Sequence, residues 1–479
     1  MAVEQNKRQE LTNLILECIK EVFSVVINKI EEKKYISSHS SFPKLSFREN
    51  GFPNINNSWT NNGPKNYASL FHKYGREAPD IDWNNFTTLE NLYKYIGNDH
   101  ELLNYFGFGL RVSVPEIDLN RKSVELLVEN ILDYYIHVYG YDFNGNNLLK
   151  VIELRTNFAF LEKLKITIYV PILFLNFEVD RYDLGEGISI QKLSDLLHLS
   201  RVEAKSNNVL VHDCILEGAT HALVIENYYI DNKDKDSFGC LYRKDAYPNF
   251  LIINFFSALR LTTDYKTGYA QIFSNPENWT TNFKEKLLNI RGCSVREFPN
   301  EFELDRYWLN KSFTSLNQGD LEKIKKLYEK LSNNNHKSIP IALKRLNSCM
   351  LRHDEEDTVL DATIALEVLL SDDGKTEMTH KLALRIAALS KLDDACKETP
   401  KEIFNKVKKI YSYRSGIVHG TKDLTKSRII RIPNSVELKT VDVAIDILKM
   451  VLRVLLCNEQ YFDAKKIDEE LLLGVGGDA

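Results

Sequence analysis

The sequence lacks the features that mark secreted, membrane and metal-binding proteins. It has 479 residues and seven cysteines, and no two of the cysteines form a C-x-x-C pair. Scattered cysteines argue against a disulfide framework or a zinc site and fit a reducing compartment. No apolar run approaches the roughly 18–20 residues of a membrane span, because Arg453 interrupts the longest candidate, residues 450–457. We therefore expect a cytoplasmic protein that uses no metal and enters no membrane.

Phosphate-binding signatures are missing as well. There is no Gly-x-x-x-x-Gly-Lys-Ser/Thr loop, and the glycines of residues 140–145 and 185–187 fit turns rather than a dinucleotide fingerprint. We expect no cofactor. The net charge is −5, so the chain is no polycation. Any nucleic-acid site must therefore be a local basic patch.

The length and patterning of the chain predict several domains. Hydrophobic residues make up 43% and charged residues 27%, which is typical of soluble globular proteins, and 479 residues exceed one ordinary core. Apolar residues recur at helical spacing over residues 8–34, followed by a polar linker over 37–65. Residues 86–106 and 120–138 also have helical patterning. From about residue 151 to 273 the pattern favours strands, with candidates at 165–177, 185–190, 222–230 and 269–273.

Helical periodicity dominates after residue 310. The predicted helices span residues 320–332, 338–352, 358–371, 377–390, 400–415 and 436–460. Short loops between them favour an up-and-down bundle. The predicted fold class is α+β, with a mixed α/β N-terminal domain followed by an all-α bundle. The predicted divisions are 1–35 (N-terminal amphipathic helix), 36–310 (mixed α/β sensor or regulatory domain), 311–465 (helical bundle) and 466–479 (tail).

Charge is segregated within the predicted bundle. Residues 401–431 carry nine cations against two acids, whereas residues 353–374 carry eight acids and no Lys or Arg. A basic strip of this kind can neutralise RNA phosphates, and its tyrosines could stack on bases. The same pattern is also typical of a solvated helix face. The candidate RNA-binding residues are Lys408, Lys409, Tyr411, Tyr413, Lys422, Lys426 and Arg428.

The strongest chemical signal is the spacing of Arg414 and His419 in the segment Tyr-Ser-Tyr-Arg-Ser-Gly-Ile-Val-His-Gly. A guanidinium holds phosphate oxygens and an imidazole moves protons near neutral pH, so the pair suits RNA cleavage without a metal. Residues five apart on a helix are rotated by roughly 140°. Both can reach one phosphate if the helix loosens at Gly416 or ends at Gly420. Alternatively, two copies of the motif meet across a dimer axis.

Two further charges stand among apolar neighbours. Glu367 lies between Leu366 and Val368, and Arg385 lies in a similar apolar stretch. Because a buried charge needs a partner, we expect these two side chains to pair across two helices. The pair would either fix the helix register or orient Arg414 and His419.

Residues of about 310–462 resemble the Apea-like branch of the HEPN superfamily (higher eukaryote and prokaryote nucleotide-binding domain). The segments that carry the resemblance are 365–370, 382–389 and, above all, 410–420; residues 258–261 and 267–268 resemble the region that precedes the domain. One difference is Ser415, since catalytic members often have Asn, Asp or His directly after the arginine. A serine hydroxyl can still donate a hydrogen bond to phosphate.

The resemblance implies a metal-independent endoribonuclease whose bundles pair as a homodimer or higher homo-oligomer. Many relatives act in antiphage, toxin–antitoxin or abortive-infection systems, often on tRNA. Carried onto this chain, Arg414 and His419 would be catalytic, with Ser415, Glu367 and Arg385 in support. A phage-derived trigger would act at the N-terminal domain. The alternative is a non-catalytic HEPN module that binds RNA, a nucleotide or a protein.

Overall fold

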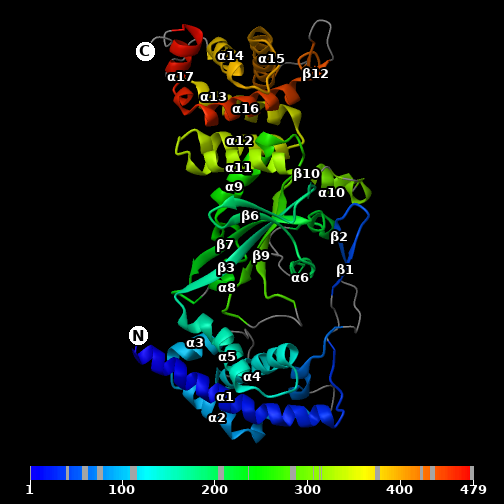
Figure 1. Cartoon of the computed structure of the whole chain (residues 1–479), viewed down its shortest axis with the longest axis vertical. Helices are drawn as coiled ribbons and strands as arrows, with labels where there is room; N and C mark the ends of the chain where they lie inside the picture. Colours follow the sequence, from blue (N-terminus) through cyan, green and yellow to red (C-terminus); the bar gives the residue numbers. More distant parts are fainter. Residues whose placement is uncertain are drawn as a thin grey trace.

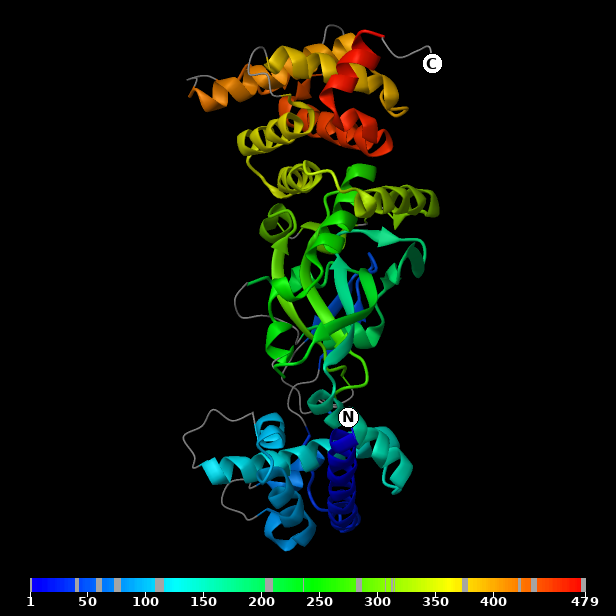
Figure 2. The same cartoon turned by 90° about the vertical axis from the view of Figure 1, so that its left-hand side faces the viewer.

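The chain folds into three units arranged along one long axis, with the N-terminal helices in the unit at one end and the C-terminal helices in the unit at the other (Figures 1 and 2). A computed structural model describes residues 2–474 except for short segments. The positions outside the description are 39–42, 57–62, 73–78, 108–115, 203–209, 236, 281–286, 306, 312, 314, 373–377, 421–423 and 432–436. Helix and sheet are both present, as the sequence predicts, and no helix among the described residues is long and apolar enough to cross a bilayer.

The N-terminal unit is mainly helical. Its helices are α1 (Ala2–Glu31), α2 (Thr87–Gly97), α3 (His100–Gly107), α4 (Glu116–Tyr139) and α5 (Gly145–Phe160). One hydrophobic core joins them, from Leu11 on α1 to Ala159 on α5. The core therefore crosses the predicted division at residues 35 and 36. The region from 151 to 160 is helix rather than strand, because Leu148, Val151 and Ile152 fall on one helical face.

The middle unit is built on a six-stranded antiparallel sheet. Its strand order is β5 (Arg181–Gly185), β6 (Ile188–Lys192), β7 (His221–Asp231), β3 (Lys163–Ile172), β8 (Tyr269–Pro276) and β9 (Arg291–Glu297). The predicted strands correspond to β3, β6, β7 and β8. Two short pairs accompany the sheet: β1 (Lys44–Phe47) with β2 (Pro53–Asn56), and β4 (Asn176–Phe177) with β10 (Ser315–Leu316). The short helices of this unit are α6 (Asp195–Ser200), α7 (Asp213–Leu216), α8 (Ser237–Cys240) and α10 (Glu301–Asp305).

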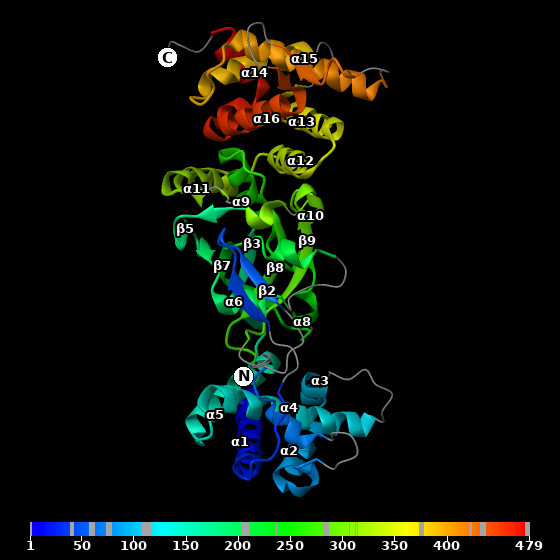
Figure 3. The ribbon, with the colours of Figure 1, turned by 90° about the vertical axis from the view of Figure 1, so that its right-hand side faces the viewer.

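The β1–β2 hairpin belongs spatially to the middle unit, although it follows α1 in sequence (Figure 3). Phe52 is fully buried there, and its core partners include Phe174 and Trp308. Arg48 and the backbone N–H of Ile55 both bind the Glu217 carboxylate. The chain thus leaves the N-terminal unit, contributes a hairpin to the middle one, and returns.

The C-terminal unit is a helical bundle. Its elements are α11 (Gln318–Asn333), α12 (Ile339–Leu351), α13 (Glu355–Leu370), α14 (Met378–Leu389), α15 (Pro400–Val418), α16 (Thr440–Cys457), α17 (Ala464–Lys466) and a final helical turn, Ile467–Leu472, with a small β11–β12 pair (Ile429–Ile430, Leu438–Lys439). All six predicted helices are present. Helix α9 (Asn249–Thr262) lies between the sheet and α11, α12 and α16 (Figure 1), and one hydrophobic core runs from Leu164 on the sheet to Ile467.

Candidate active site

Helix α15 carries both candidate catalytic residues near its C-terminal end. Thr399 caps its first turn by accepting a hydrogen bond from the Glu402 N–H, while the Glu402 side chain accepts one from the Thr399 N–H. The helix continues without a break through Gly416 to Val418, so the loosening that we expected at Gly416 is not seen. It ends at His419, and Gly420 follows with a left-handed φ of 67°.

Arg414 faces helix α13 and is half-buried. Its Nη2 lies 3.6 Å from Oε1 of Glu367, and the two side chains are 36% and 23% exposed. Arg414 Nε is buried and, among the described residues, has no hydrogen-bond partner. The expected pairing of Glu367 with Arg385 is therefore wrong: Glu367 pairs with the candidate catalytic arginine instead.

Arg385 is tied to the end of the chain. Its Nε and Nη2 donate to the two carboxylate oxygens of Asp468 at 2.8 and 2.5 Å, and Nη2 also donates to Asp372 at 2.6 Å. Nη1 donates to the Leu370 carbonyl at 2.8 Å. The hydrogen bonds that Arg385 donates to Asp468 hold the pKa of Arg385 above its usual range. Through these contacts Arg385, on α14, holds the final helical turn (Ile467–Leu472) against the C-terminal end of α13.

His419 and Ser415 are exposed at the end of α15. The backbone N–H of His419 donates to the Ser415 carbonyl at 3.0 Å, which closes the last turn of the helix. Within the described part of the chain, no hydrogen bond or ion pair joins the Arg414 and His419 side chains. The imidazole and the Ser415 hydroxyl are thus open to solvent, while the guanidinium is held beside α13.

The two candidate stacking tyrosines are core residues. Tyr411 is 5% exposed and Tyr413 is 1% exposed, and burial raises the pKa of both phenols. Tyr411 continues the apolar stripe of Val407 and Ile410 at helical spacing, and its hydroxyl donates to the Thr363 carbonyl on α13 at 3.5 Å. The prediction that these rings stack on RNA bases is therefore wrong for the folded chain.

The basic strip is partly compensated. Lys408, Lys409 and Lys426 are exposed. Lys408 Nζ lies 5.6 Å from the Phe404 ring centroid, and Lys409 donates to the Arg431 carbonyl at 2.8 Å. Other cations of the strip already have acidic partners, namely Lys406 with Glu398, Arg428 with Glu356 at 2.9 Å, and Arg431 with Glu437 at 2.8 Å. Lys422 lies outside the described residues.

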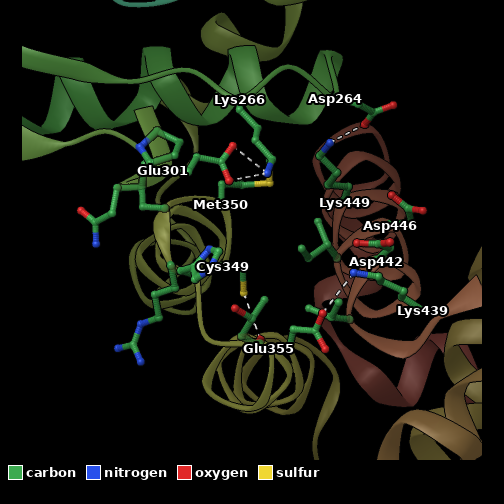
Figure 4. A pocket seen from close by; sticks show the side chains of 18 residues that line it. Asp264, Lys266, Glu301, Cys349, Met350, Glu355, Lys439, Asp442, Asp446 and Lys449 are labelled. Carbon is green, nitrogen blue, oxygen red and sulfur yellow. Dashed lines mark hydrogen bonds and ion pairs between the residues drawn. The ribbon is translucent and has the colours of Figure 1, made fainter. Parts of the chain in front are cut away.

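A separate cleft of about 460 Å³ lies between the middle unit and helices α12, α13 and α16 (Figure 4). Three ion pairs line it: Lys449 with Asp264 at 2.6 Å, Lys266 with Glu301 at 2.9 Å, and Lys439 with Glu355 at 3.2 Å. Burial raises the pKa of the Asp446 carboxyl beside them. Because each of the three lysines has an acidic partner and Asp442 and Asp446 add further carboxyl groups, this cleft offers RNA no strong positive field.

Sequence reasoning missed the partners of Arg385. Asp468 is 83 residues away along the chain, and no local pattern distinguishes it from other acids. For metals, the described residues contain no group of three or more His, Cys, Asp or Glu side chains that could hold an ion. The seven cysteines are all free thiols.

Comparisons with protein-family models, with curated proteins and with solved structures gave no significant match.

Proposed function

We propose that the protein is a metal-independent endoribonuclease whose reacting groups are Arg414 and His419. The observation that carries the proposal is their position at the end of α15: a guanidinium beside the Glu367 carboxylate of α13, and one turn later an exposed imidazole at the helix terminus. We take RNA as the substrate, with tRNA as the first candidate, and the cytoplasm as the site of action.

The chemistry is a transesterification. The ribose 2′-oxygen attacks phosphorus, the new O–P bond forms, and the bond from phosphorus to the 5′-oxygen breaks. One imidazole accepts the proton of the 2′-hydroxyl and a second delivers a proton to the leaving 5′-oxygen. Arg414 binds the non-bridging oxygens and stabilises the charge that develops on them. The products are a 2′,3′-cyclic phosphate and a 5′-hydroxyl, so DNA is not cut.

Groups near the pair support RNA binding. The Arg414 Nε is a buried donor without a partner among the described residues, and a phosphate oxygen would satisfy it. The Ser415 hydroxyl is exposed one residue away, and Lys408 and Lys426 extend the positive surface. Tyr411 and Tyr413 have no part in the contact, because they are buried. Arg385 supports the site only by holding the bundle together.

A homodimer provides the second imidazole. Residues five apart on an unbroken helix point in directions roughly 140° apart, so one subunit does not readily bring both groups onto one phosphate. Two α15 termini facing each other would supply two arginines and two histidines to a shared cleft.

We assign the sensing of an activator to the N-terminal and middle units. In an antiphage or abortive-infection system this activator is of phage origin.

The test uses purified wild-type protein, Arg414→Ala and His419→Ala with total RNA in EDTA. Wild type should cut RNA and both variants should lose at least roughly 100-fold in rate, as for removal of an electrostatic or acid–base group. Lys401→Ala removes an exposed cation at the other end of α15 and should cut normally. Equal cleavage by wild type and by either alanine variant would show that the site is elsewhere.

Mixing the two inactive variants tests the shared cleft. A mixed dimer holds one Arg414 and one His419, from different subunits, in the shared cleft, so cleavage should return in part, below the wild-type rate because the second imidazole is missing. If both groups act within one subunit, the mixture stays inactive and the composite site is wrong.

If wild type cuts nothing even with a phage lysate present, the result favours the alternative, a non-catalytic module that binds RNA, a nucleotide or a protein. That alternative has one point in its favour, since Glu367 already neutralises part of the Arg414 charge.

A further inference from the structure

A second cavity lies at the junction between the middle unit and the bundle, away from Arg414 and His419. It is bounded by α9, α11 and α12 and has a volume of about 710 Å³, which is in the range of small-molecule sites. Much of its lining is apolar, including Phe250, Ile253 and Phe256 on α9 and Leu343 on α12. Two of these large side chains stand open to solvent, Phe250 at 64% and Ile253 at 37%.

The polar feature of this cavity is Arg260, which lines it and is only 2% exposed. Its Nη1 donates to the side-chain oxygen of Asn347 at 2.5 Å, and Nη2 donates to the Thr267 carbonyl at 3.1 Å. The guanidinium carbon lies 5.8 Å from the centroid of the Phe256 ring. Arg260 Nε is buried and has no hydrogen-bond partner in the part of the chain that the structure describes. One donor of a fully buried guanidinium therefore remains available.

The charge of Arg260 is not balanced by an ion pair. Both of its hydrogen-bond acceptors are neutral, and none of the ion pairs between described residues includes it. Glu297 lines the same cavity, but Lys244 binds its carboxylate at 2.6 Å. Burial lowers the pKa of Arg260 to about 10, which leaves the group charged at neutral pH. Glu297 attracts Arg260 through space without an ion pair between them, so the buried cation lacks a directly bound counter-charge, and an anion from outside would supply one.

We propose that this cavity binds a small amphipathic anion, with its carboxylate or phosphate-monoester head at Arg260 Nε and its apolar body against Phe250, Ile253 and Phe256. A single donor is unsatisfied, so one acceptor oxygen of the head is enough to pair with it. The exposed Phe250 and Ile253 side chains account for the apolar body, since large apolar side chains in a cavity are covered when such a ligand enters.

The experiment is calorimetric titration of the full chain with octanoate, octyl phosphate and octanol. The three probes share the apolar body and differ in the head. At least one anion should bind with a Kd in the range of roughly 10–500 µM, and octanol should bind at least tenfold more weakly, because a charge-assisted hydrogen bond is worth about 1.5–3 kcal/mol. Whichever anion binds more tightly identifies the head. Octanol binding as tightly as both anions would overturn the role of Arg260.

Variants at the cavity mouth keep the test independent of folding, since Arg260 itself holds Thr267 and Asn347. Phe250→Glu places a negative charge on a side chain that is already 64% exposed, and it should weaken binding of the anion at least tenfold. Tyr229→Glu makes the same change on β7, at a residue that is 54% exposed and outside the cavity lining, and it should bind as wild type does. Equal affinity of the two variants, or no heat with any probe, would rule the site out.

Discussion

Glu367 Oε1 lies 3.6 Å from Arg414 Nη2, so a carboxylate on α13 faces the guanidinium on α15. Both side chains remain partly in water, and ion pairs of this kind contribute only about 0.2–1 kcal/mol to stability. The consequence of the pair is therefore one of orientation: it fixes the direction in which the arginine points. Tyr411, buried between the same two helices, makes that stretch of α15 rigid.

Replacing Glu367 with Gln keeps the shape of the side chain and removes its charge. If the carboxylate orients Arg414 for phosphate binding, cleavage should fall by roughly 10-fold or more while the melting temperature shifts by no more than about 2 °C. A cleavage assay and differential scanning calorimetry on the same preparation distinguish the two effects. Normal cleavage with a lowered melting temperature would give Glu367 a purely structural role.

Removing the Asp468 carboxylate should destabilise the bundle without harming the chemistry. Asp468→Ala leaves the 3%-exposed side chain of Arg385 with Asp372 and one carbonyl. Because Asp468 itself is 37% exposed, we expect a loss of about 1–3 kcal/mol rather than the larger cost of a fully buried pair. Urea unfolding measures the loss. Cleavage per folded molecule at low temperature should match wild type, and a selective loss of cleavage would instead place Arg385 in the active site.

Acid should destabilise the middle unit through a buried neutral histidine. Burial lowers the pKa of His221 to about 4, with Lys192 adding to the shift and the bond to the Val179 carbonyl and nearby Asp180 opposing it. The unfolded chain binds this proton near pH 6.5 and the folded chain does not, so stability falls as pH drops from about 6.5 towards 4.

The size of this effect can be tested with a single variant. At pH 5 the contribution of His221 is on the order of 2 kcal/mol. His221→Asn should therefore lose less stability than wild type between pH 7.5 and pH 5, as measured by urea unfolding at both values. His353→Asn changes an exposed histidine and should follow the wild-type dependence. An unchanged slope in the His221 variant would assign the acid sensitivity to other groups.

Gly268 should tolerate no side chain. A Cβ at this position would lie 2.0 Å from the Glu297 carbonyl oxygen and 2.8 Å from the Phe298 Cα, and the Gly268 carbonyl accepts a hydrogen bond from Leu173 at 2.9 Å. Gly268→Ala must push backbone apart, so we expect a loss of more than about 3 kcal/mol and little soluble protein. Gly145→Ala, where nothing lies within 4 Å, should instead stabilise by about 0.4–1 kcal/mol. Thermal unfolding of the pair tests the contrast.

Local periodicity was enough to predict most of the helices and strands, and it failed where the signal depends on distant partners. In the helices of the bundle the apolar periodicity extends over the whole helix, so these helices could be predicted from the sequence alone. Strand β9 could not be predicted in this way. Its polar residues alternate with only two apolar ones, Cys293 and Val295, and the segment is a strand because it pairs with β8. Helix α5 was misread because its apolar residues resemble the start of the following strand.

The candidate site shows the same division. The end of α15 at His419 and Gly420 follows from the sequence, since a glycine with a left-handed φ terminates helices. The burial of Tyr411 could also have been predicted, because Tyr411 lies four residues after Val407 on the apolar face of the helix. The partner of Glu367 could not be predicted, because it depends on how α13, α14 and α15 pack and four arginines lie within 50 residues, namely Arg345, Arg352, Arg385 and Arg414.

The hydrophobic core that runs unbroken from the sheet into the bundle has a consequence for dissecting the molecule. Helix α9 covers apolar side chains of α11 and α12, such as Ile324 and Leu343. A fragment cut at residue 311 would present that face to water and associate through it. The bundle and the sheet thus share one core, and a displacement of α9 would reach α15, which carries the candidate catalytic pair, through α16.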